Sequence, residues 1–115
     1  MGSENRQRPR KNTPHLVKVL DLRTLETVGR VVDITADGMK IVTKHDIGVG
    51  EIFEFRIVLP VMVHYRTEID VEAEAMWTRQ DDNPVYKTTG FRFVDLPGED
   101  GFLLEDVMHK LNLVG

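Results

Sequence analysis

Apolar and polar residues alternate along most of the chain, with the period of two that is typical of half-buried β-strands. The alternation is clearest in Glu68–Trp77, where every second residue, ending with Trp77, is apolar and the positions between include four acids. One face of this strand is therefore expected to be buried, Trp77 included, and the other to face water, as in an antiparallel sheet. The same pattern predicts six strands: Leu16–Leu20, Thr27–Ile34, Met39–Thr43, Glu51–Leu59, Glu68–Trp77 and Val85–Val94.

Turn-forming residues separate several of these runs, and the period changes near the end of the chain. The turn signals lie at residues 36–38, 48–50 and 81–84. From Phe102 to Leu111, apolar residues recur at helical spacing, with acids early and Lys110 late, which suits a helix dipole. The pattern predicts an all-β fold with one helix, a small barrel or sandwich in which the C-terminal α-helix plugs one end or covers an edge.

The first residues differ from the rest in both pattern and charge. Residues 1–14 are polar, contain Pro9 and Pro14 and show no apolar periodicity, so we expect a flexible basic arm, followed by a single domain over residues 15–115. The chain of 115 residues has a net charge of −4, which divides into +4 for residues 1–20 and −8 for the remainder. Basic arms of this kind often meet anions, which include nucleic acid, nucleotide phosphates and the chain's own acidic surface. The acidic body argues against a broad nucleic-acid interface.

The composition excludes several kinds of chemistry. The absence of cysteine excludes disulfides and thiolate sites, the four histidines show no metal-ligand spacing, and Ser3 is the only serine. The paired acids, Asp81 with Asp82 and Glu72 with Glu74, fall on turns or solvent faces, where they are expected to be solvated. No apolar run suits a membrane span, and the N-terminus has no apolar segment typical of a signal peptide. The sequence thus favours a cytoplasmic, non-enzymatic protein without a metal.

Two short motifs remain. Arg6 and Arg10 form an R-x-x-x-R pattern in the arm, and residues 33–38 form D-x-T-x-x-G with Asp33, Thr35 and Gly38. Each motif alone is common. Two arginines four residues apart arise by chance in a basic arm, and an ordinary turn could equally use Asp33 and Thr35 as caps and Gly38 for a positive φ. The two motifs together, in this order and with strands on both sides of the second, form a specific signature that rarely arises by chance.

With these motifs the sequence resembles the PilZ domain family, the bacterial receptors for cyclic dimeric GMP. The resemblance runs from Arg6 to about Leu111 and includes residues 29–41, Trp77 and residues 89–93. It implies a six-stranded antiparallel β-barrel with a C-terminal α-helix. Thr35 stands where the family usually has serine, and because the hydroxyl is kept we expect the function to be kept.

The resemblance implies that cyclic dimeric GMP is bound by Arg6, Arg10, Asp33, Thr35 and Gly38, with Arg8 and Lys11 as candidates for additional charge. An arginine fork matches O6 and N7 of guanine, and Asp33 and Thr35 accept hydrogen bonds from its N–H groups. The arm would fold over the ligand, and a separate downstream protein would read the changed surface. The expected ligand is cyclic dimeric GMP itself. We expect no cofactor, no binding of a nucleic-acid polymer and no insertion into a membrane.

Two alternatives remain open at this point. The first is a degenerate PilZ-like protein–protein interaction module that does not bind nucleotide, although such modules typically lose residues like Arg6, Arg10 and Asp33. The second is an unrelated small barrel whose basic arm touches RNA or DNA, which the acidic strand face disfavours.

Overall fold

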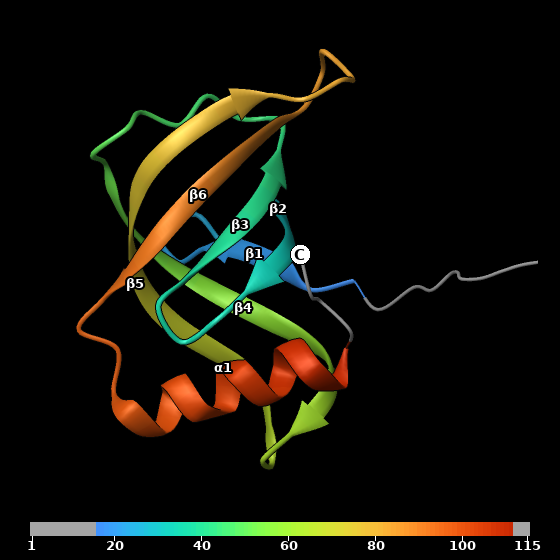
Figure 1. The fold of residues 1–115 in the computed structure, drawn as a ribbon, viewed down its shortest axis with the longest axis vertical. Helices are drawn as coiled ribbons and strands as arrows, with labels where there is room; N and C mark the ends of the chain where they lie inside the picture. Colours follow the sequence, from blue (N-terminus) through green and yellow to red (C-terminus); the bar gives the residue numbers. More distant parts are fainter. Residues whose placement is uncertain (1–15, 112–115) are drawn as a thin grey trace, which may run out of the picture.

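The described residues, 16–111 of this computed structural model, form a closed barrel of six antiparallel strands followed by one helix (Figure 1). The predicted fold class is confirmed, while the predicted arm, residues 1–14, lies outside the described residues. Around the barrel the strands follow the order β1-β2-β3-β6-β5-β4. The elements are β1 (Lys18–Asp21), β2 (Thr27–Ile34), β3 (Gly38–Thr43), β4 (Ile52–Val63), β5 (Arg66–Gln80), β6 (Lys87–Val94) and α1 (Gly98–Lys110).

The barrel closes because the short first strand pairs on both sides. β1 is antiparallel to β2 along one edge and to β4 along the other, so the described sheet has no free edge. The alternating side chains send one apolar set inward from every strand. At the centre, Phe55 is fully buried, stacks on Phe53 with ring centroids 5.1 Å apart and meets the edge of Phe91 at 5.1 Å.

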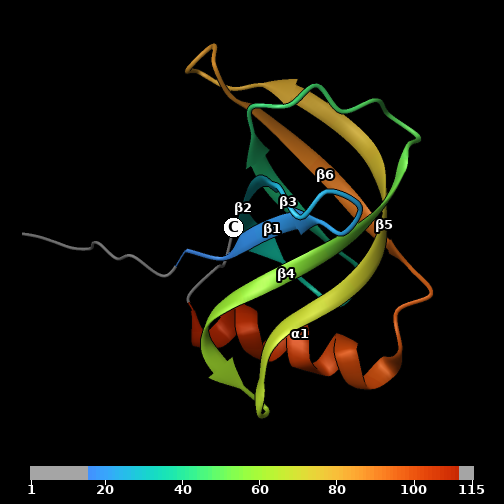
Figure 2. The same cartoon turned by 180° about the vertical axis from the view of Figure 1, so that it is seen from behind.

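Helix α1 lies across one end of the barrel, near the bottom of both views, where only the tip of the β4–β5 hairpin reaches lower (Figures 1 and 2). Its inward face buries Leu103, Leu104 and Val107 against the core. Because a closed barrel leaves no edge to cover, the helix plugs the end instead, which settles the choice left open by the sequence. Its first turn carries acids and its last turn carries bases, as the dipole favours. Within residues 16–111, no helix is long and apolar enough to cross a bilayer.

The hairpin that joins β4 to β5 is longer than the alternation predicted. β4 runs on to Val63 and β5 begins at Arg66, with His64 and Tyr65 at the turn in left-handed conformation (φ 49° and 63°). Neither residue is a glycine or proline, so no turn signal marks this position in the sequence. The hairpin tip is fastened to α1 by two contacts, His64 Nε2 to Asp106 Oδ2 at 2.6 Å and Arg66 Nη1 to Asp100 Oδ1 at 3.0 Å.

Candidate ligand-binding site

The D-x-T-x-x-G motif forms the turn between β2 and β3. The backbone N–H of Thr35 donates to the Gly38 carbonyl at 2.9 Å. The Thr35 hydroxyl accepts from the backbone N–H groups of Asp37 at 3.2 Å and Gly38 at 3.4 Å. Thr35 therefore caps the turn, as its position in the motif suggested, and the hydroxyl that threonine shares with serine performs this task.

Asp33 faces outward because β2 is irregular just before it. The pairing with β3 shifts between Val31 and Asp33, so Val31 and Ile34 both point into the core although they are three residues apart. Asp33 takes no part in the turn hydrogen bonds of the described residues, contrary to the expectation that it helps to cap the turn. Its carboxylate faces Lys40 across the ladder, with Nζ at 3.7 Å, a long and loose pair that leaves the carboxylate able to accept other donors.

Gly38 has a different role from the one expected. Among the described glycines only Gly50 has a positive φ, so the predicted positive φ at Gly38 is wrong. Gly38 is instead the first residue of β3, opposite Arg92 of β6. A Cβ at this position would collide with the carbonyl oxygen of Phe91. Glycine is needed here because β3 and β6 approach each other closely.

Trp77 is also placed differently from the prediction. The pairing of β5 with β6 shifts between Ala75 and Trp77, and this bulge at Met76 moves Trp77 from the inner phase to the outer face of the barrel. Its side chain is half-exposed rather than part of the core. The indole lies over Gly90, where a Cβ would overlap the ring, and the Arg79 guanidinium lies over the indole at 5.2 Å.

These residues meet in one shallow pocket on the outer face, with a volume of about 210 Å³. Asp33 lines it from β2, Thr35 from the turn, Gly38 and Lys40 from β3, and Trp77 from β5. Three of the predicted site residues are thus brought together. The others, Arg6, Arg8, Arg10 and Lys11, lie outside the described residues.

Trp77 was not predicted to be a pocket residue. A signal was present, because Met76 and Trp77 are two large apolar residues in succession at the end of a strictly alternating strand. Such a pair interrupts the period of two and is compatible with a bulge.

The pocket combines a flat aromatic surface, a carboxylate and an ammonium group. A planar heterocycle could lie against the Trp77 ring while its N–H groups donate to Asp33, and Lys40 is placed for a negatively charged substituent. Within residues 16–111 no cluster of three or more histidines or acids is arranged to hold a metal ion. The ring of Trp77 and the charged groups of Asp33 and Lys40 suit the pocket to recognising a ligand by its shape and hydrogen bonds.

Comparisons with known proteins agree with the fold and show the family. No curated protein sequence matches the chain. Among solved structures, the one titled as Bacillus subtilis inhibitor of motility (MotI/DgrA) is similar, with a TM-score of 0.66 at 19% identity. The similarity covers 87% of this chain and 49% of the other, so this chain spans about half the length of that protein. The sequence model of the family described as PilZ domain matches residues 4–109, and the chain therefore belongs to the PilZ domain family.

Proposed function

We propose that this PilZ domain binds cyclic dimeric GMP in the pocket formed by Asp33, the Thr35–Gly38 turn and Trp77. Arg6 and Arg10 of the N-terminal segment complete the site by folding over the ligand. The observation that carries the proposal is that the D-x-T-x-x-G motif and a half-exposed indole share one pocket. PilZ domains are receptor or adaptor modules rather than enzymes, which agrees with a pocket built for binding.

The ligand's chemistry matches the groups on the pocket wall. A guanine offers N–H donors on one edge, which the Asp33 carboxylate accepts, and a flat face, which stacks on Trp77. Its other edge carries the acceptors O6 and N7, which match the paired donors of an arginine fork. Two phosphates add negative charge for the arginines and for Lys40.

The arginines are within reach of this pocket along the chain. Arg10 precedes Lys18 by eight residues, a length that spans up to roughly 27 Å when extended. Lys18 pairs with Arg30 on β2, and Asp33 lies only three residues farther, about 10 Å along the strand. A ligand on Trp77 and Asp33 can therefore be covered by Arg6 and Arg10 without any change in the barrel.

Binding would act as a signal by changing which surface the protein presents. The N-terminal segment would become ordered on the barrel when the ligand is bound, and a separate protein would recognise the resulting surface. Ordering this segment costs conformational entropy, so we expect moderate affinity that decreases with ionic strength. Amide relaxation measurements test this step: residues 5–12 should be mobile without ligand and rigid with it.

Calorimetric titration tests the binding itself, with GTP and a linear dinucleotide as controls for selectivity. Arg6→Ala, Arg10→Ala and Asp33→Ala should each lose about 1.5–3 kcal/mol of binding free energy, the scale of a hydrogen bond to a charged group. Lys110→Ala, at the C-terminal end of α1 and outside the lining of the pocket, serves as the matched loss of charge and should bind normally. Unchanged affinity in the Arg6→Ala/Arg10→Ala double variant would refute the site, and no binding by the folded protein would favour a PilZ-like protein-interaction module.

A further inference from the structure

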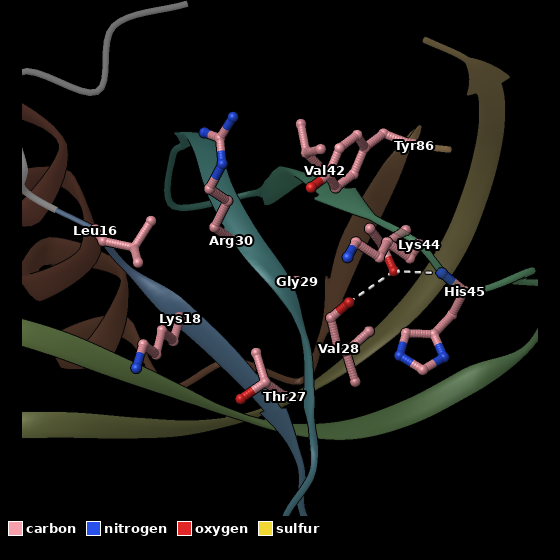
Figure 3. Close-up of a pocket in the computed structure, with 11 residues that line it drawn as sticks. Leu16, Lys18, Thr27, Val28, Gly29, Arg30, Val42, Lys44, His45 and Tyr86 are labelled. Carbon is pink, nitrogen blue, oxygen red and sulfur yellow. Dashed lines mark hydrogen bonds between the residues drawn. The ribbon is translucent and has the colours of Figure 1, made fainter. Parts of the chain in front are cut away.

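A second groove lies on the outer face of β1, β2 and β3, and it shares no lining residue with the Asp33–Trp77 pocket (Figure 3). Its volume is about 270 Å³. Lys18, Arg30 and Lys44 line it, and no acidic side chain does. Figure 3 shows Leu16 and Lys18 on one side of the groove, Tyr86 and Lys44 on the other, and Arg30 between them.

The three cations differ from most of the other basic residues in the described part of the chain. Each of the following forms an ion pair with a carboxylate: Arg23, Lys40, Arg56, Arg66, Lys87 and Arg92. Lys18, Arg30 and Lys44 form none with any carboxylate of residues 16–111, and all three are exposed. The groove thus gathers positive charge that no carboxylate of residues 16–111 compensates.

The register of the sheet places two of these cations side by side, which is unfavourable when no anion lies between them. Lys18 of β1 is directly opposite Arg30 of β2, and Arg30 is directly opposite Val42 of β3. Like charges directly opposite on neighbouring antiparallel strands repel each other. An anion placed between Lys18 and Arg30 would turn this repulsion into two attractions.

The remaining lining defines the rest of the ligand. Tyr86 offers an aromatic ring, with the Lys44 ammonium 5.5 Å from its centroid. Leu16 and Val42 add apolar surface beside it. A ligand that contacts both ends of the groove would place a phosphate or pyrophosphate between Lys18 and Arg30 and a flat ring against Tyr86.

We infer that this groove is a second binding site, for a nucleotide held by its phosphate between Lys18 and Arg30 and by its base against Tyr86. The site does not depend on binding at the Asp33–Trp77 pocket. Its occupant is either a separate mononucleotide or a second molecule of cyclic dimeric GMP, which share this chemistry and which experiment distinguishes.

Amide chemical-shift titration of the full chain tests the inference, with GMP, pyrophosphate, guanosine and cyclic dimeric GMP as the probes. GMP and pyrophosphate should move the amide signals of Lys18, Arg30 and Lys44 at millimolar concentration or below, and guanosine should move them far less. Arg30→Gln should weaken GMP binding about tenfold or more, the effect of losing one hydrogen bond to a charged group. Lys110→Gln is the matched control, and it should bind GMP like the unmodified protein.

The outcomes separate the two sites. If GMP and pyrophosphate leave the groove amides unmoved, or if Lys110→Gln weakens GMP as much as Arg30→Gln does, the inference is overturned. If cyclic dimeric GMP moves the groove amides as well as those of residues 33–38, and Arg30→Gln abolishes only the groove shifts, the messenger is the occupant. Failure of cyclic dimeric GMP to move residues 33–38 would count against the proposed function alone. Lys18→Gln, which removes the other cation at the phosphate end, repeats the test should Arg30→Gln perturb the fold.

Discussion

Replacing Gly38 by alanine tests whether this glycine serves the fold or the ligand. A Cβ at Gly38 would collide with the Phe91 carbonyl oxygen and would lie 3.2 Å from its carbonyl carbon and 3.3 Å from the Arg92 Cα. All three atoms belong to the backbone of β6, so no side-chain rotation can relieve the contact. The strands must separate at the position where Gly38 pairs with Arg92.

The expected cost follows from this geometry. Overpacking of this kind costs about 1–3 kcal/mol, and the alanine recovers less than about 1 kcal/mol through the reduced freedom of the unfolded chain. A net loss of about 1–2 kcal/mol should lower the melting temperature by about 4–8 °C in a domain of this size. Gly98→Ala is the matched control, because a Cβ there meets nothing within 4 Å, and it should melt at the same temperature or higher.

Thermal unfolding followed by circular dichroism measures this difference directly, with a calorimetric titration of cyclic dimeric GMP on the same samples. A Gly38→Ala protein that melts like the unmodified protein but binds ligand more weakly would refute the packing argument. It would show instead that the glycine keeps space for the ligand.

Three further predictions concern the pocket, the core and the stability of the fold at low pH. Trp77 is the only tryptophan of the chain, so cyclic dimeric GMP should change its fluorescence, and Trp77→Ala should lose about 1–3 kcal/mol of binding while Trp77→Phe keeps most of it. Phe55→Ala should lower the free energy of unfolding by about 3–5 kcal/mol in urea titration, because it empties the centre of the aromatic cluster. The side-chain hydrogen bond from Arg23 holds the pKa of Asp21 below its ordinary value, against the opposing effect of burial. A lowered pKa in the folded state stabilises the protein above pH about 4 and ceases to do so as the pH falls through that pKa. Asp21→Asn should therefore lower the urea midpoint at pH 7 and have progressively less effect below pH 4; an equal effect at both would contradict the argument.

The strands and the helix could be predicted because each carries its own period. A run such as Glu68–Ala75 has one face that is stable only when buried, whatever lies opposite, and the helical spacing after Phe102 is equally local. The turn capped by Thr35 could also be predicted, because its hydroxyl accepts hydrogen bonds from N–H groups only two and three residues away.

The candidate site could be predicted only in part. Asp33, Thr35 and Gly38 were identified from their motif, whereas Trp77 was assigned to the core. Its true position depends on a bulge at Met76, and that bulge is defined by the register of β5 against β6. The groove beside Arg30 was not predicted either, since Lys18 and Arg30 become neighbours only when β1 pairs with β2.

The sequence by itself determined the all-β class, the terminal helix and the chemistry of the motif, because alternation, helical spacing and turn preference act over a few residues. Only the tertiary structure decided where Trp77 points and why residue 38 must be glycine. It also brought three cations together in one groove. These features depend on which strands are neighbours and in what register, and register is set by contacts between residues far apart in the chain.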